Sequence, residues 1–276
     1  MMATDELGDN GLPIADVGEW VENKLAAIRE YVTITAPARR NYLRRGNAGV
    51  TYIELFCGPG QARVRGTNDV YDGSAIVAAQ AARDSGVPFT DVYLADTNKD
   101  YVDACVHRVG GSARRFSCVG PASETSESIL GKLNPHALHF VVLDPFNLDD
   151  LPFDVIKNLA RLRHVDMLIH FSSQDLQRNL DLNLAGDRDN LDGFCPGWRL
   201  SVPVRASKNA QRRAYADHWC SLMSNLGMTT ANAVEHVVGT KNQTLYWLYF
   251  AAKNPLAIKL WNAMSAARGP QRQLFV

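Results

Sequence analysis

The sequence predicts a doubly wound α/β fold with a mostly parallel sheet. Short β-branched and aromatic runs alternate with segments whose apolar residues recur at helical spacing, which is the pattern of repeated βαβ units. A glycine-rich turn, Cys57-Gly58-Pro59-Gly60, follows the first strong apolar run. In an open α/β sheet, this first turn borders the crevice where ligands bind. We expect about seven strands, with the last two forming an antiparallel hairpin.

The predicted elements begin after a flexible acidic leader at residues 1–15. A helical extension at 16–46 follows, with Asp16 as its N-cap and Glu19 three residues later. Near the end of the extension lie arginines that we expect to be exposed: Arg39, Arg40, Arg44 and Arg45. The remainder of the chain is predicted to continue as part of a single domain at 16–276.

The parallel strands are predicted from apolar runs at 50–56, 91–96, 115–119, 138–143 and 165–171. The helices between and after them are expected at 75–83, 98–109, 153–163 and 209–225, with Ser74 capping the first. An insertion at 184–208, irregular in sequence, could be a lid. The hairpin is predicted at 231–238 and 244–252, and Pro255 starts a terminal helix.

Composition and charge exclude several classes of protein. Lys+Arg and Asp+Glu are both 29, so a polybasic nucleic-acid coat is disfavoured, although a local basic face is not. No apolar run reaches about 18 residues, so no transmembrane helix and no membrane partner are predicted. The acidic N-terminus lacks the apolar core of a signal peptide. The 5 cysteines show no CxxC spacing, which predicts no disulfide framework and no cysteine-based zinc site, and free thiols suggest a bacterial or other cytoplasm.

The strongest chemical signal is an acid on a strand that runs into the glycine turn. Glycine lets the backbone approach a ligand closely. Phe56 occupies the first glycine position of the dinucleotide fingerprint, and Pro59 lacks an N–H, so a pyrophosphate site is disfavoured. A small-molecule site is favoured over a purely structural turn. Its candidate cofactor-binding residues are Glu54, Phe56, Cys57, Gly58, Pro59 and Gly60.

Asp96 ends the second predicted strand, about one βα unit after the turn. An acid at this place can accept both hydroxyls of a ribose, so we add it to the cofactor-binding residues. The alternative is that it caps the next helix through Thr97 and Asn98.

Asp144, Pro145 and Phe146 follow the fourth predicted strand and are the candidate catalytic residues. The carboxylate and the proline carbonyl could accept hydrogen bonds from an amine or hydroxyl, and the phenyl ring could stack on a planar ring. The alternative is a capping turn with Phe146 in the core. His170 ends the fifth strand and could border this site, although a core or surface histidine is the simpler interpretation.

Several other residues are weaker candidates. Arg63 and Arg65 follow the turn and could bind a substrate phosphate or be solvated. Cys57 lacks an identifiable activating base, so packing or cofactor contact is expected rather than nucleophilic attack. A basic face around the crevice could also include Arg199, Arg205, Lys208, Arg212 and Arg213.

Together these motifs resemble Rossmann-like, S-adenosylmethionine-dependent methyltransferases. The segment from Glu54 to Gly60 is similar to the first motif of base-modifying members, and Asp144-Pro145-Phe146 looks like a shortened D-P-P-Y/F motif. The resemblance implies S-adenosylmethionine as cofactor and a nucleic-acid base as acceptor. In that family the acid and a proline carbonyl hold an exocyclic amine. This chain has one proline where the family has two.

A second resemblance covers most of the chain. The blocks at 20–25, 52–60, 72–74, 144–146 and 246–256 occur in the order found in the bacterial three-Cys-motif partner proteins. That resemblance implies a radical-type enzyme as a protein partner. Two alternatives to a methyltransferase therefore stay open. One is a non-catalytic binding module for such an enzyme, and the other is a phosphodiesterase that holds a divalent metal with Glu54, Asp96 and Asp144.

Overall fold

The computed structural model describes residues 6–8, 11–18, 21–44, 48–232, 235–238 and 244–268. The chain divides into two compact units, residues 1–142 and 143–276, a division that the prediction of a single domain at 16–276 did not include. Among the predicted features, parts of the leader at 1–15 and of the strand at 231–238, together with Glu19, Arg45 and the hairpin turn at 239–243, lie outside the described residues.

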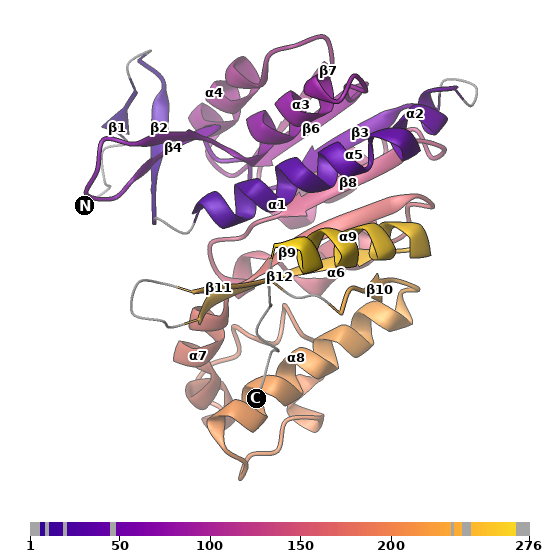
Figure 1. The fold of residues 1–276 in the computed structure, drawn as a ribbon. Coiled ribbons are helices and arrows are strands. Elements are labelled where there is room, and N and C mark those ends of the chain that lie inside the picture. The colour runs from indigo at the N-terminus through magenta and orange to yellow at the C-terminus, as the bar shows by residue number, and fades with distance from the viewer. Residues whose placement is uncertain are drawn as a thin grey trace. The chain divides into compact units, whose positions relative to one another are not determined.

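The core of the first unit is a parallel sheet with the strand order β8-β3-β6-β7 (Figure 1). Its strands are β3 (Val50–Glu54), β6 (Asp91–Asp96), β7 (Arg114–Val119) and β8 (Leu138–Leu143). Every residue of β3 is buried, as its β-branched and aromatic sequence predicts. Glu54 pairs with Leu94 in β6 and with Val142 in β8, so these strands end at the same edge. The predicted α/β fold with a mostly parallel sheet is confirmed.

The helices of this unit are α1 (Val21–Ile34), α2 (Ala36–Arg44), α3 (Ser74–Asp84), α4 (Lys99–Val109) and α5 (Ala122–Leu130). Asn98 caps α4, because its side chain accepts hydrogen bonds from the Asp100 and Tyr101 backbone N–H groups. The predicted cap of α3 is wrong. Gly73 occupies the N-cap position, and Ser74 is the first helical residue.

A second, small sheet has the order β1-β2-β4-β5. Its strands are β1 (Glu6–Leu7), β2 (Pro13–Val17), β4 (Gln61–Val64) and β5 (Val70–Asp72). Asp16 lies in β2 opposite Arg63 of β4, so it does not cap a helix, and α1 begins at Val21. The described part of the predicted leader is therefore largely strand, because its short apolar runs pair with the chain beyond the glycine turn.

Arg39 is buried, whereas the sequence analysis expects an exposed arginine face. The face is exposed at Arg40 and Arg44. The Arg39 guanidinium donates hydrogen bonds to Thr35 Oγ1 (3.0 Å), Ser85 Oγ (2.8 Å) and the Val87 carbonyl (3.3 Å). Burial lowers the pKa of Arg39 to about 10. These partners replace water around the charge and tie α2 to the end of α3.

The second unit contains β9 (Val165–Phe171), β10 (Thr229–Thr230), β11 (Glu235–Val238) and β12 (Thr244–Ala252). The strand β12 pairs antiparallel with each of the other three, which confirms the predicted C-terminal hairpin. The core around it is aromatic, with Phe171 contacting the rings of Phe194, Trp219 and Tyr249.

The helices of this unit are α6 (Phe153–Leu159), α7 (Ser173–Ala185), α8 (Lys208–Asn225) and α9 (Pro255–Ala267), with short 3-10 helices at Leu148–Asp150 and Trp198–Leu200. Asn254 caps α9, whose first residue is Pro255, as predicted. The helix α6 is shorter than predicted. No helix of the described residues is long and apolar enough to cross a membrane.

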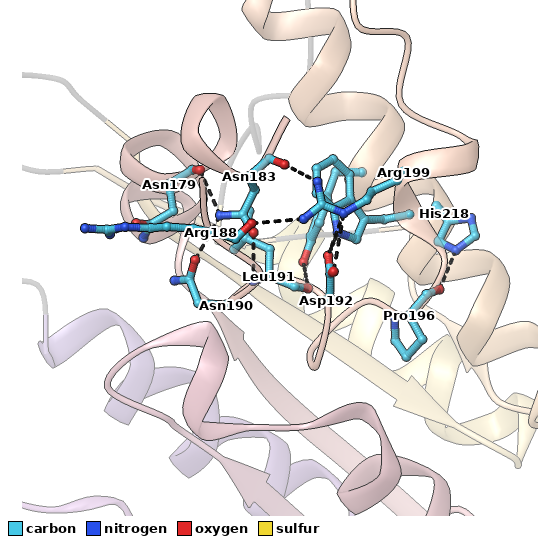
Figure 2. A network of polar contacts seen from close by, with 11 residues as sticks. Asn179, Asn183, Arg188, Asn190, Leu191, Asp192, Pro196, Arg199 and His218 are labelled. Atoms are coloured by element: carbon cyan, nitrogen blue, oxygen red, sulfur yellow. Dashed lines mark hydrogen bonds and ion pairs between the residues drawn. The ribbon is translucent and has the colours of Figure 1, made fainter. Parts of the chain in front are cut away.

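The predicted insertion at 184–208 is a packed part of the second unit. Its first residues belong to α7, and Trp198 is fully buried within it. The Trp198 indole donates to Asp192 Oδ1 (2.6 Å), and the buried Asn183 amide donates to Asn190 Oδ1 (2.8 Å). Figure 2 shows Asn183, Asn190 and Asp192 within a continuous polar network that joins this loop to α7. Fixed side-chain amides and a buried indole make this segment part of the core rather than a loose lid.

Candidate functional site

The glycine turn after β3 has two residues in the left-handed region, Gly58 (φ +52°) and Gly60 (φ +82°). A Cβ atom at Gly60 would lie 3.1 Å from Cys105 Cα, whereas one at Gly58 would have no atom within 4 Å. Gly60 is therefore required by both backbone conformation and space. Gly58 instead leaves room beside the backbone, which is the property that a ligand-binding turn needs.

Hydrogen bonds fix the turn from both sides. The Cys57 N–H donates to the Ala95 carbonyl (2.9 Å), and the Gly73 N–H donates to the Gly60 carbonyl (2.7 Å). The Gly58 N–H donates to Asp96 Oδ2 (3.0 Å). The structure therefore brings together two parts of the predicted cofactor site that are 38 residues apart in the sequence.

Asp96 is half-buried at the end of β6. Its Oδ1 atom accepts a hydrogen bond from the Asn98 N–H (3.1 Å), while Oδ2 contacts the glycine turn. This contact lies in the turn before α4, whose N-cap is Asn98, so the alternative that Asp96 itself caps the helix is wrong. Each carboxylate oxygen can accept more than one hydrogen bond, so these contacts are compatible with a ribose on the same group.

Glu54 is fully buried below the turn. Tyr52 donates its hydroxyl hydrogen bond to Glu54 Oε2 (2.9 Å), and the Ser74 hydroxyl donates to Oε1. Burial, and then the Glu54 carboxylate, raises the pKa of Tyr52 well above its ordinary value. Glu54 therefore holds β3 against the start of α3, and its contact with a cofactor remains a prediction.

Arg108 is a residue of this site that the sequence analysis missed. From the last turn of α4, its Nη1 atom donates to the Pro59 carbonyl (2.7 Å) and to the Pro13 carbonyl (2.6 Å). It therefore holds the glycine turn and β2 together. A basic residue in the last helical turn is the only local signal, and that position is equally typical of a solvated residue.

The two arginines after the turn lie in different surroundings. Arg63 is half-buried in β4, and Arg65 is exposed, with Nη2 at 3.4 Å from the Asp16 carbonyl. Cys57 is buried, and its hydrogen bond with Cys105, followed by burial, raises the pKa of its thiol. A neutral thiol is a poor nucleophile, which agrees with packing as the role of Cys57.

The predicted catalytic residues lie in the second unit, directly after β8. Phe146 is 84% exposed, so the alternative of a core phenylalanine is wrong. His170, at the end of β9, places Nδ1 at 3.3 Å from Asp144 Oδ1 and at 3.2 Å from the Pro145 carbonyl. The edge of the His170 ring packs on Tyr246, with ring centroids 4.3 Å apart. The structure therefore adds His170 and Tyr246 to this cluster.

The segment after Phe146 is anchored on α7. Asp175 Oδ2 accepts a hydrogen bond from the Leu148 N–H (3.0 Å). Ser172 caps α7, because its hydroxyl accepts from the Asp175 N–H (3.1 Å). These buried anchors hold the base of the loop, so the exposure of Phe146 is a property of an ordered segment.

Most of the predicted basic face in the second unit is paired with acids or amides. Arg199 pairs with Asp192 at 3.2 Å, Arg213 lies 3.7 Å from Asp217, and Lys208 pairs with Asp181. Arg212 donates to Gln177 Oε1 (3.0 Å). These contacts reduce the positive potential available for a phosphate backbone.

No group of three or more His, Cys, Asp or Glu side chains within the described residues could hold a metal ion. Glu54 shows why, because both its oxygens face donors inside the first unit. The metal-dependent alternative therefore gains no support from the arrangement of the described acids.

No family model matches the sequence. No curated protein matches it either. Among solved structures, the chain is similar to a protein from Legionella pneumophila, with a TM-score of 0.50 and 11% identity over 88% of this chain and 92% of that one. This likeness is one of overall fold.

Two weaker structural likenesses are to Trm1 from Pyrococcus horikoshii in complex with S-adenosyl-L-methionine and to the N-methyltransferase NodS from Bradyrhizobium japonicum in complex with S-adenosyl-L-homocysteine. For Trm1 the TM-score is 0.45 with 12% identity, over 83% of this chain and 54% of that one. For NodS the TM-score is 0.43 with 7% identity, over 85% and 88%.

Proposed function

We propose that this protein is an S-adenosylmethionine-dependent methyltransferase. The observation that carries the proposal is the hydrogen bond between the Gly58 N–H and Asp96, which joins the glycine turn and the strand-end acid of the parallel sheet. Gly58 leaves space beside the backbone, and Asp96 offers a carboxylate for ribose hydroxyls. These two features at one edge are what an adenosyl cofactor requires.

The proposed cofactor-binding residues are those of the turn and of the next strand: Glu54, Phe56, Cys57, Gly58, Pro59, Gly60 and Asp96. Glu54 and Arg108 support the turn from below and from the side, through Ser74 and the Pro59 carbonyl. When bound, S-adenosylmethionine supplies an electrophilic methyl group on a sulfonium. The chain contributes a turn held rigid before the ligand arrives, so little ordering free energy is lost on binding.

On the acceptor side, we propose that Asp144, Pro145 and Phe146 position a nucleic-acid base. The exposed Phe146 ring is suited to stacking against a planar group. Arg63 and Arg65 are the proposed contacts for a substrate phosphate. In this scheme the catalysed reaction depends mainly on holding the acceptor in line with the methyl group.

Calorimetric titration with S-adenosylmethionine tests the cofactor proposal, with NAD and Mg²⁺ as controls. We expect one site of micromolar affinity for S-adenosylmethionine alone. Asp96→Ala is expected to weaken binding at least about tenfold, since one charged hydrogen-bond partner is lost. Asp100→Ala, on the exposed surface of α4, is the matched control and should bind normally. Absence of binding to the wild-type chain would reject the proposal.

A second candidate is a binding module for a radical-type enzyme in a bacterial cytoplasm, as the resemblance to the three-Cys-motif partner proteins implies. Two large apolar side chains in the segment 184–208 favour it. Leu200 is 95% exposed and Val204 is 65% exposed, and exposed apolar side chains that lie together are typical of protein interaction sites. A Leu200→Glu/Val204→Glu variant should lose such a partner in a pull-down while retaining S-adenosylmethionine binding. Loss of cofactor binding without loss of a partner would contradict this assignment.

A further inference from the structure

The Nδ1 atom of the His170 ring faces two groups that can only accept hydrogen bonds. Its Nδ1 atom lies 3.2 Å from the Pro145 carbonyl and 3.3 Å from Asp144 Oδ1. A carbonyl has no proton to give, and neither has an ionised carboxylate. Nδ1 must therefore carry the hydrogen that is shared between them. In the neutral imidazole the other nitrogen, Nε2, is then the proton acceptor.

From this geometry we propose that His170 Nε2 takes a proton from the methyl acceptor, and that Asp144 is a positioning residue that orients His170. The inference rests on the proposed methyltransferase function and deepens it. A histidine whose Nδ1–H is held by a carboxylate has a fixed tautomer, and its charged form is stabilised when it gains a proton. The cluster has this arrangement of base and orienting acid.

The same contacts restrict the chemistry of the acceptor. Asp144 Oδ1 and the Pro145 carbonyl both face Nδ1, so these two oxygens, which would hold an exocyclic amine in the resembled motif, are directed at the imidazole instead. A base that collects a proton suits an acceptor atom that must lose one to become nucleophilic. The exposed Phe146 ring adds a preference for a planar group. We therefore assign the acceptor as a nucleobase whose ring nitrogen carries an ionisable proton, as in uracil, thymine and guanine.

The acceptor nitrogen forms a bond to the methyl carbon with its own electron pair, the carbon–sulfur bond breaks, and its electrons remain on the sulfur as S-adenosylhomocysteine. The acceptor's N–H proton moves to His170 Nε2, leaving the N–H bonding pair on the nitrogen. The imidazolium that forms faces the Asp144 carboxylate, and it later releases the proton to water. The other titratable group known to face the ring is Tyr246, from β12.

The first experiment needs no cofactor. Long-range ¹H–¹⁵N spectra of the histidine rings, recorded against pH and assigned with His170→Gln, report the tautomer and the pKa directly. We expect neutral His170 to be protonated at Nδ1, and Asp144→Asn to lower its pKa because the stabilising negative charge is removed. A ring protonated at Nε2, or a pKa unchanged by Asp144→Asn, would overturn the proposed dyad.

The second experiment measures single-turnover methyl transfer from labelled S-adenosylmethionine to single-stranded oligonucleotides. Oligouridylate and oligothymidylate carry a ring N–H but no exocyclic amine, whereas oligoadenylate and oligocytidylate carry the amine but no ring N–H. We expect label only on the first pair. Label on the second pair, or on none while the cofactor binds, would overturn the assigned acceptor.

For the accepted probe, His170→Gln should slow transfer by about 100-fold or more and remove the loss of rate at acid pH, since the base is absent. Calorimetric affinity for S-adenosylmethionine should stay within about twofold, which separates this role from misfolding. His136→Gln, an exposed histidine, is the control. A His170→Gln variant with wild-type rate and pH profile overturns the role of His170. A wild-type chain that binds no S-adenosylmethionine overturns the proposed function itself.

Discussion

The turn at 57–60 in the first unit and the segment at 144–146 in the second each follow a buried parallel strand, but they are held in different ways. The glycine turn is fixed through its own backbone groups, which bond to the Ala95 and Gly73 backbone and to the Asp96 and Arg108 side chains. The second segment is fixed through side chains, with His170 on Asp144 and Pro145. The first region is therefore expected to be sensitive to changes in backbone geometry. The second should be sensitive to the chemistry of individual side chains.

Buried tyrosines and thiols in both units, Tyr52 and Cys57 in the first among them, respond to alkaline pH, and this gives the largest expected change. Burial raises the pKa of Tyr215 and Tyr249 in the second unit, and that of Cys220 to about 11. A tyrosine or thiol with a raised folded pKa stabilises the fold below its unfolded pKa, and this stabilisation is lost as the pH rises. Arg39 in the first unit has the opposite sign, because its folded pKa is lowered.

We therefore expect the free energy of unfolding to fall steeply above pH 9 to 10, the ordinary range for thiols and tyrosines. Urea titrations followed by circular dichroism at pH 8 and above pH 10 check this. Tyr249→Phe should flatten the loss. Stability that is constant over this range would contradict the burial of these hydroxyls.

The next largest effect comes from adding a methyl group to the glycine turn. Gly60→Ala should lower the free energy of unfolding by about 3 kcal/mol, combining left-handed strain with a close approach to the Cys105 backbone. Gly66→Ala is a close control, because its φ of +81° is almost the same as the +82° of Gly60 but no atom lies within 4 Å. It should cost only about 1 kcal/mol. If urea titrations gave equal losses of unfolding free energy for the two variants, the backbone around Gly60 would have to shift to accommodate the added methyl group.

A side-chain change in the second unit tests the contrast directly. Asn183→Ala removes the amide that donates to Asn190 and accepts from the Leu191 N–H. It should cost about 2 kcal/mol, because buried polar groups lose their partners. Asn209→Ala, exposed on α8, should change stability by less than about 0.5 kcal/mol. Thermal or urea unfolding measures both variants. An unchanged free energy of unfolding for Asn183→Ala would show that this polar network does not stabilise the loop.

The smallest effect on stability is expected at Phe146. Phe146→Ala should leave the free energy of unfolding within about 0.5 kcal/mol, because an exposed ring contributes little to the core. Methyl transfer to a planar acceptor should nevertheless fall, whereas Phe146→Trp should retain it. A Phe146→Ala variant that unfolds more easily would indicate that the ring packs on the protein, and one with full activity would remove the stacking role.

The local sequence pattern was sufficient to predict strands that are buried on both faces. The sequence predicts β8 and β9 with the bounds that the structure has, since both are short runs that are mostly apolar. It also places the glycine turn and the C-terminal hairpin correctly. Both are indicated by short runs of residues, either glycines with a distinct backbone preference or apolar residues that favour burial.

Sequence reasoning failed where a polar side chain finds partners far along the chain. Arg39 meets Ser85 and Val87, more than 40 residues away, and nothing near it in the sequence indicates burial. Arg108 reaches Pro59 from another element, across 49 residues of sequence. Such contacts depend on which strand ends and helix ends the topology brings together.

The distribution of tryptophan side chains allows the second unit to be followed separately by fluorescence. Trp198, Trp219, Trp247 and Trp261 all lie in it and are buried, and the remaining tryptophan of the chain is Trp20. Intrinsic emission will therefore report chiefly on the second unit, while far-ultraviolet ellipticity reports on both. Denaturation curves from the two signals would coincide if the units melt together and would separate if they melt in turn. Recording both signals on the same sample would then determine whether this chain unfolds in a single cooperative transition.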